Sequence, residues 1–518
     1  MEQETVLHIE GTVEQVLYRN EQNGYTVLDL DANGTLITVV GELGDVEEGE
    51  QLSVDGTYVN HIRFGVQFQA QYVERKLPED AINIQRYLSS GVIKGIGSAL
   101  AKKIVTAFGS QTLEIMEKQP TRLMEIRGIS PKKCETIAQE VQKIFALRSL
   151  MLFLQQYNIR SRYAMRAYQY YGSGAKEMIL ANPYLLCGMG IELPFEKAEL
   201  LADDLKVPKN AEQRILAGTC YILEHNTHNG YTCLPLDRLQ PKVCEYLQVS
   251  ESEFLSAYQA AQKEGNLVSY QKDAREFVYL PAYYEAEQYI ADRIGVLRDF
   301  SAPEDQEIYL DLIKREETEQ GIQYAELQRK AILSALSRGL LILTGGPGTG
   351  KTTTLNGMIS LFEKQGYQVM LAAPTGRAAQ RMSDLTGYEA KTIHRLLEVE
   401  FDMAGATKFR HNESNPLTCD VMIVDEMSMV DVLLFESLLR ALRFSCKLIM
   451  VGDSDQLPSV GAGNVLKDLI DSGQVPVVAL NQIFRQAQQS CIVTNAHKII
   501  TGNYPDLQQK QSDFFFFQ

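Results

Sequence analysis

The sequence predicts a multidomain α/β protein, in which a small β-barrel, helical repeats and a winged-helix-like module precede a parallel α/β domain. Three observations predict this order. Residues 1–75 contain short, β-branched, alternating runs separated by Gly-rich turns. A helix–turn–helix unit then occurs twice before residue 147. Beyond residue 336, three apolar runs end in glycines or carboxylates. At 518 residues, the chain is also too long for one ordinary core.

Composition sets broad limits. No run of about 18 apolar residues occurs, and the start MEQETVLHIE is acidic without an apolar signal core. We therefore expect no transmembrane helix, no membrane partner and no export. None of the eight cysteines forms a CxxC pair, so neither a zinc site nor a disulfide framework is indicated. These features predict a cytoplasmic protein.

Charge is distributed unevenly along the chain. The formal net charge of −16 argues against a protein that coats nucleic acid non-specifically. Residues 1–90 carry 5 Lys and Arg against 16 Asp and Glu, a net of −11. Residues 91–168 carry 13 against 5, a net of +8. Two interpretations of the basic segment stay open, a solvated helical face and a nucleic-acid contact.

Residues 1–75 are expected to form a small closed barrel of the OB type. The Asn-Gly pair in DANGTL is a signal for a two-residue hairpin. Such barrels often bind single strands on aromatic platforms. Because this segment is strongly acidic, a scaffold or protein-contact role is an equal alternative.

Residues 76–147 contain the repeat, in GVIKGIGSALAKKIVTAFG and LMEIRGISPKKCETIAQEV. Both copies resemble the helix-hairpin-helix motif, in which the turn and the next helix offer backbone N–H groups to a DNA phosphate. A plain helical hairpin with a glycine C-cap is the alternative, and Ser130 departs from the second-glycine pattern. The residues expected at DNA are Lys94, Gly95, Gly97, Lys102, Lys103, Gly128, Lys132 and Lys133.

The next segments are mainly helical. In residues 148–210, GMGIELPFEKAELLADDL looks like a degenerate third hairpin. Residues 211–282 predict a helix, the stretch YTCLP, two helices and two short strands, an order that resembles a winged helix. As evidence for DNA contact this is weak, since many such modules only pack against neighbours. A helical link over residues 283–335 follows.

The stretch LLILTGGPGTGKTTT predicts a phosphate-binding loop between a strand and a helix, because it fits the pattern G-x4-GK[ST]. Glycines let backbone N–H groups surround the phosphates, Lys351 reaches the β and γ phosphates, and the Thr352 hydroxyl holds Mg²⁺. The residues expected at the nucleotide are Gly345, Gly346, Pro347, Gly348, Thr349, Gly350, Lys351, Thr352 and Thr353.

Two more apolar runs end in polar residues. In CDVMIVDEMSMVD, a buried strand over Val421–Val424 ends in Asp425 and Glu426. Buried carboxylates are costly without a cation nearby, so we expect Asp425 to hold Mg²⁺ and Glu426 to polarise the attacking water. An ordinary surface Asp-Glu pair is the alternative. In CKLIMVGDSDQLPSVGAGN, a third strand leads to Gln456, a candidate for the γ-phosphate or its water.

Together these segments resemble the superfamily 1 helicases, most closely the RecD-like branch with a long N-terminal extension. The motifs that match are ELQRKAI, GGPGTGKTTT, APTGRAAQRM, TIHRLL, VDEMSMV, VGDSDQLPSVGAGNVL and LNQIFRQ. The barrel, hairpin repeats and winged segment occur in the same order in that branch, so the resemblance covers nearly the whole chain. It implies a RecA-like P-loop ATPase domain, 1A, over residues 336–475 and the start of a second RecA-like domain over 476–518. The stretch GDSDQLPSVGAG argues against an AAA+ ATPase, a transporter ATPase or a small-molecule kinase.

The resemblance also implies ATP and Mg²⁺ as cofactors and a role for each motif residue. Lys351 and Thr352 bind phosphate and Mg²⁺, Asp425 is the Mg²⁺ carboxylate, and Glu426 is the catalytic base. By the same resemblance, Gln328 contacts the adenine edge, and Gln456 contacts the γ-phosphate and couples it to DNA. Arg485 reaches the γ-phosphate from the second RecA-like domain. The segments expected near the single strand contain Pro374, Thr375 and His394.

The implied function is an ATP-dependent DNA helicase of 5′→3′ polarity in DNA repair or recombination. Its expected partners are single-stranded DNA and DNA junctions or duplex ends, with no small-molecule substrate beyond ATP, and we expect a monomer. No candidate for motifs V and VI follows LNQIFRQ, and the terminal FFFF predicts a strand for an absent sheet, so we expect a fragment of a longer protein. One alternative is therefore a truncated fragment that binds DNA and ATP without unwinding. Another is a conjugation helicase of the TraA type, although no relaxase cluster is visible among the 7 histidines.

Overall fold

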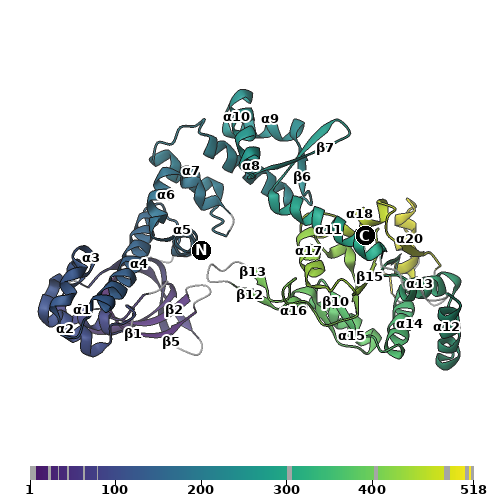
Figure 1. The fold of residues 1–518 in the computed structure, drawn as a ribbon, viewed down its shortest axis with the longest axis horizontal. Coiled ribbons are helices and arrows are strands. Elements are labelled where there is room, and N and C mark those ends of the chain that lie inside the picture. Colours follow the sequence, from purple (N-terminus) through teal and green to yellow (C-terminus); the bar gives the residue numbers. More distant parts are fainter. Residues whose placement is uncertain are drawn as a thin grey trace. The chain divides into compact units, whose positions relative to one another are not determined.

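The computed structural model (Figure 1) describes residues 7–20, 25–32, 34–43, 46–61, 65–78, 80–90, 92–188, 190–299, 306–401, 407–482, 490–507 and 513–514. The chain divides into two compact units. The first comprises residues 1–208 with 401–406, and the second comprises residues 209–400 with 407–518. Each unit has buried apolar cores of its own.

The first unit begins with a closed five-stranded barrel, which confirms the predicted β-barrel. Its strands follow the order β1-β2-β3-β5-β4, in which β3 and β5 are parallel and the other neighbours antiparallel. Alternation places Leu28, Leu30, Val39 and Phe68 inside the barrel, each 0% exposed. The strands are β1 (Leu7–Arg19), β2 (Tyr25–Ala32), β3 (Thr35–Glu42), β4 (Gln51–His61) and β5 (Gly65–Lys76).

The helical repeat follows the barrel as two hairpins. A turn between α1 (Ala81–Ser89) and α2 (Ser98–Phe108) contains Gly95 at φ +96°, and a turn before α4 (Pro131–Gln155) contains Gly128 at φ +110°. Ser130, the departure from the glycine pattern, caps α4 by accepting a hydrogen bond from the Lys133 N–H at 3.3 Å. The remaining helix of the pair is α3 (Thr112–Lys118).

The helix α4 continues without a break through the expected boundary at residue 147, since its 25 residues run from Pro131 to Gln155. A third turn follows later in the unit. Gly190, at φ +85°, precedes α7 (Phe195–Asp204), and a Cβ at this position would overlap the Tyr170 ring. The helices between are α5 (Ser161–Tyr171) and α6 (Ala175–Ala181).

The second unit opens with the helix and strand order expected of a winged helix. Its three strands form a sheet in the order β6-β8-β7. The elements are α8 (Glu212–Thr227), β6 (Cys233–Pro235), α9 (Leu236–Leu247), α10 (Glu251–Lys263), β7 (Val268–Lys272) and β8 (Arg275–Tyr279). Three helices then lead to the main sheet, α11 (Pro281–Asp299), α12 (Gln306–Gln320) and α13 (Glu326–Ser337).

The main sheet has six parallel strands in the order β11-β10-β14-β15-β9-β16. Alternate residues of β9 enter opposite cores, Leu340 and Ile342 one, Leu341 and Leu343 the other. This burial on both faces explains the continuous apolar runs in the sequence. The strands are β9 (Leu340–Gly345), β10 (Val369–Ala373), β11 (Ala390–Thr392), β14 (Val421–Val424), β15 (Lys447–Gly452) and β16 (Val477–Leu480).

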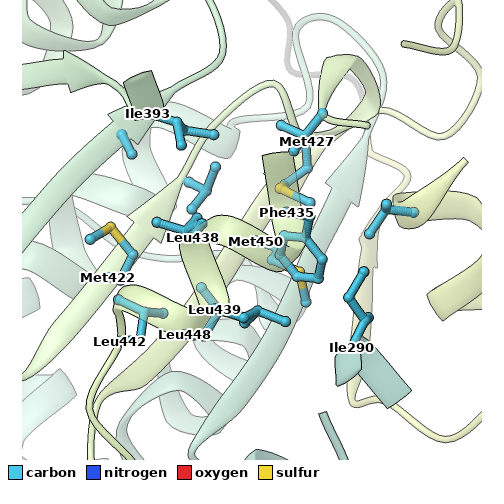
Figure 2. Packing of buried hydrophobic residues seen from close by; sticks show 14 of the residues in the cluster. Ile290, Ile393, Met422, Met427, Phe435, Leu438, Leu439, Leu442, Leu448 and Met450 are labelled. Atoms are coloured by element: carbon cyan, nitrogen blue, oxygen red, sulfur yellow. The ribbon is translucent and has the colours of Figure 1, made fainter. Parts of the chain in front are cut away.

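Helices cover both faces of this sheet. Figure 2 shows one face, where Phe435 and Leu438 of α17 (Val432–Ala441) pack with Met422 and Leu448 of the strands. Ile290 of α11 belongs to the same core. On the other face, α12, α13, α14 (Lys351–Lys364) and α15 (Gly376–Thr386) contribute. The smaller elements are α16 (Ile393–Leu397), β12 (Val399–Phe401), β13 (Thr407–Phe409), α18 (Val465–Asp471) and α20 (Cys491–Ile500).

In the part of the chain that the structure describes, no helix is long and apolar enough to cross a membrane. The cytoplasmic location stays a prediction. The segment FFFF lies largely outside the described residues.

Candidate nucleotide-binding site

The glycine-rich loop joins the end of β9 to the start of α14. Gly348 and Gly350 have φ values of +75° and +85°, a backbone region that favours glycine. The Thr349 hydroxyl donates a hydrogen bond to the Gly346 carbonyl at 2.9 Å, which closes the loop on itself. The N–H groups at the start of a 14-residue helix therefore adjoin the loop, an arrangement that suits a phosphate.

Lys351, the first residue of α14, folds back over this loop. Its ammonium group donates hydrogen bonds to the Gly345 carbonyl and, at 3.2 Å, to the Gly346 carbonyl. Burial lowers the pKa of Lys351, whereas the charges of Asp453 and Asp425 oppose that shift. The cation is thus held at the loop in a partly desolvated place.

Asp425 and Glu426 lie directly after β14. The Glu426 N–H donates to the Asp425 carboxylate at 2.9 Å, and the Glu426 backbone has a φ of +52°, which is strained for a residue other than glycine. Burial raises the pKa of Asp425. Burial, and then the charge of Asp425, raise the pKa of Glu426, while Lys351 and Arg381 lower both values. The two carboxylates therefore occupy a site where a further cation is favourable.

A third set of polar residues follows the end of β15. Asp453 is buried at 4% exposure, and its carboxylate accepts a hydrogen bond from the Asp455 N–H at 3.1 Å. The Gln456 N–H donates to the Asp453 carbonyl at 3.2 Å, which leaves the exposed Gln456 side chain beside the cavity. The sequence interpretation did not include Asp453, although its place at the end of an apolar strand marks it as another buried carboxylate.

These strand ends and loops enclose one cavity of about 1160 Å³, large enough for a nucleotide. Of the nucleotide residues expected from the sequence, all except Gly345 and Arg485 line it. Gly345 adjoins it through its contact with Lys351. Arg485 lies outside the described residues. The expected residues that line the cavity are Gln328, Gly346, Pro347, Gly348, Thr349, Gly350, Lys351, Thr352, Thr353, Asp425, Glu426 and Gln456.

Gln328 is buried on α13, at 4% exposure. Its side-chain oxygen accepts a hydrogen bond from the Ala325 N–H at 2.9 Å, and its amide nitrogen donates to the Gly350 carbonyl at 3.3 Å. The side chain thus ties the start of α13 to the phosphate loop. The expected contact with adenine stays a prediction.

Two lining elements were not foreseen from the sequence. Arg381 of α15 lines the cavity, as do Ala496, Ile499 and Ile500 of α20. His497 of α20 packs on the loop so closely that a Cβ added to Gly346 would lie 2.9 Å from its Cε1 atom. The Nε2 atom of His497 is buried and has no hydrogen-bond partner within the described ranges. Arg381 lies in the motif APTGRAAQRM, whose expected role was contact with the single strand and not with the nucleotide, and no motif covers the α20 residues.

The residues expected at DNA fall in both units. In the first unit, the hairpin residues are exposed except Lys133, which is half-buried. In the second unit, Pro374 and Thr375 follow β10, and the Thr375 hydroxyl caps α15 by accepting from the Ala378 N–H at 3.2 Å. His394 is exposed on α16, with its ring 5.9 Å from that of Phe409.

Comparison with known proteins matches four segments of the chain to family models. Four family models match successive segments: "ATP-dependent DNA helicase YrrC, OB-fold domain" over residues 6–78, "SAM-like Helix-hairpin-helix tandem" over 86–143, "ATP-dependent RecD2 DNA helicase HHH domain" over 143–233 and "AAA domain" over 328–462. The ATP-dependent RecD2 DNA helicase of Deinococcus radiodurans is 29% identical over 520 residues, which cover 96% of this chain and 70% of that protein. Over 96% of its length, the chain is thus similar to a RecD2 helicase.

Other matches of this RecD-like chain are shorter. The RecBCD enzyme subunit RecD of Mycolicibacterium smegmatis is 44% identical over 169 residues, or 28% of this chain and 30% of that protein. The solved structure of Pif1 helicase from Candida albicans covers 36% of this chain and 46% of its own, at 27% identity and a TM-score of 0.28, too low to support an argument. The match to the RecD2 helicase and the match to the AAA domain confirm the predicted enzyme class, an ATP-dependent DNA helicase.

Proposed function

We propose that this RecD-like chain hydrolyses ATP in the cavity beside the glycine-rich loop and couples hydrolysis to 5′→3′ movement along single-stranded DNA during DNA repair. The observation that carries the proposal is the convergence of Lys351, Asp425 and Glu426, from three segments of the chain, on one cavity. The polarity rests on the resemblance to the family. The chain spans 70% of the RecD2 relative and 30% of the RecD subunit.

The loop and Lys351 are proposed to hold the phosphates. Loop N–H groups donate to phosphate oxygens, and the Lys351 ammonium exchanges its carbonyl contacts for the β and γ phosphates. The Thr352 hydroxyl and the buried Asp425 carboxylate fit Mg²⁺, because this ion needs only one or two protein oxygens when phosphates and water supply the rest. Mg²⁺ would offset charge that develops on the phosphate oxygens.

Glu426 is proposed as the base that accepts a proton from the attacking water. Its raised pKa makes it a better proton acceptor than an ordinary glutamate, while the charge of Lys351 favours its ionised form. We assign to Gln456 contact with the γ-phosphate and to Gln328 contact with adenine. Arg485 is assigned the stabilisation of charge from the second RecA-like domain.

We propose that DNA contacts form at two kinds of site. The hairpin lysines contact the phosphates of a junction or duplex end, and the segments of Pro374, Thr375 and His394 contact the single strand. The support is the exposure of these lysines beside turns with positive-φ glycines at Gly95 and Gly128. The working form is proposed to be a monomer.

The direct test separates binding from turnover. Glu426→Gln should bind Mg-ATP as tightly as the wild type, yet release phosphate at a rate lowered about 100-fold or more, the scale of a lost general base. Glu326→Gln, an exposed glutamate on α13 outside the cavity, is the matched control. Wild-type hydrolysis by Glu426→Gln would show that the base has been assigned wrongly.

A further inference from the structure

Arg381 is a cation in the cavity that none of the assigned roles uses. It lies on α15, which begins after β10, and it lines the cavity together with Asp425 and Glu426. Its side chain is exposed, and none of the ion pairs found among the described residues includes it. The guanidinium group is therefore available to a ligand in the cavity.

The helix that carries Arg381 is fixed at both ends. Thr375 caps its first turn, and the Asn356 side chain of α14 donates to the Leu385 carbonyl near its end at 3.2 Å. Met382, the next residue, is buried at 3% exposure. The lining residues Ala378, Arg381 and Leu385 follow helical spacing, so one face of α15 forms a wall of the cavity.

The charge of Arg381 acts at the reacting end of the cavity. It lowers the pKa values of Asp425, Glu426 and Lys351, as a cation does to its neighbours. Glu426 is the proposed base for the water that attacks the γ-phosphate. Arg381 thus lines the same cavity as Glu426 and Asp425, and its charge reaches both carboxylates, at the end of the cavity where the proposed reaction holds the γ-phosphate.

We propose that Arg381 binds the γ-phosphate of ATP, from the same RecA-like domain that supplies Lys351. The inference rests on the proposed nucleotide site. A guanidinium group presents paired N–H donors that match two phosphate oxygens, which suits a terminal phosphate. Since ADP lacks this phosphate, Arg381 distinguishes ATP from ADP, whereas the loop and the contact of Lys351 with the β-phosphate serve both nucleotides.

Binding of a non-hydrolysable ATP analogue and of ADP, each with Mg²⁺, tests this. Arg381→Ala should weaken the analogue about 10- to 100-fold, the effect of losing a hydrogen bond to a charged group, and change ADP affinity less than about 3-fold. Arg381→Lys, which keeps the charge and loses the fork, should give an intermediate loss. Arg377→Ala, an exposed arginine of the same helix outside the cavity, should change neither.

The variant Lys351→Ala separates this inference from the proposed function, because it should weaken both nucleotides. Suppose that Lys351→Ala weakens the binding of both the ATP analogue and ADP. If Arg381→Ala then weakens the binding of neither nucleotide, or weakens the binding of both equally, the role of Arg381 is overturned and the nucleotide site stands. If Lys351→Ala changes neither affinity, the nucleotide site itself is wrong. Retained ADP affinity in Arg381→Ala would show that the variant is folded.

Discussion

Replacement of Lys351 by alanine removes the one side-chain cation that folds over the glycine-rich loop in the described structure. Its ammonium group contacts the carbonyls of Gly345 and Gly346, and burial lowers its pKa. The charged form is thus disfavoured at this place until a phosphate arrives. We expect Lys351→Ala to fold normally and to lose affinity for Mg-ATP.

The size of the loss follows from the bonds exchanged. Two hydrogen bonds between an ammonium group and phosphate oxygens contribute about 1.5–3 kcal/mol each. Binding also gives up the two carbonyl contacts, so the lower end of that range applies and about 3 kcal/mol is lost. That free energy corresponds to roughly a 100-fold increase in Kd.

The assay is equilibrium titration with a fluorescent ATP analogue, beside thermal unfolding of the same samples. Lys330→Ala is the control, because Lys330 is exposed on α13 and lies outside the cavity. The control should bind like the wild type. An unchanged Kd for a folded Lys351→Ala variant would refute the placement of the phosphates on this loop.

Three further predictions follow from the geometry. Since the pKa of Glu426 is raised above 4.5, kcat/KM for ATP should begin to fall, as the pH decreases, at a higher pH than for an ordinary glutamate base. Protonation of Glu426 should not destabilise the fold, because burial disfavours the charged form of this side chain. A decrease in kcat/KM that begins only at or below pH 4.5 would contradict the assignment. Gly346→Ala brings a Cβ to 2.9 Å from the Cε1 atom of His497, so this change should weaken ATP binding. The added change His497→Ala should restore part of the lost affinity. Unchanged affinity in the double variant would show that the contact with His497 does not shape the loop. Charge reversal of four hairpin lysines should weaken duplex or junction binding equally for all sequences and flatten its salt dependence, whereas sequence-selective loss would indicate base contact; the residues are Lys102, Lys103, Lys132 and Lys133.

The strands and the phosphate loop were predictable because their signals are local. A strand buried on both faces needs a continuous apolar run, and a loop around phosphates needs glycine at positive φ, as at Gly348 and Gly350. The barrel was predictable for a similar reason, since its alternating pattern and hairpin turn are visible in short windows.

Contacts between distant segments were not predictable in the same way. Arg381 and His497 reach the cavity only because α15 and α20 pack beside the loop. Arg381 lies in the motif APTGRAAQRM, from which no contact with the nucleotide was expected, and His497 lies in no motif. The boundary expected at residue 147 falls inside α4, which is one continuous helix from Pro131 to Gln155. Contacts between segments that are distant in the sequence depend on tertiary packing, which short sequence windows do not show.

The most direct test of the central claim is the rate of phosphate release from Mg-ATP with and without single-stranded DNA. The account predicts hydrolysis that single-stranded DNA accelerates and that Glu426→Gln abolishes in both conditions. Hydrolysis that is indifferent to DNA, or that persists in Glu426→Gln, would contradict it.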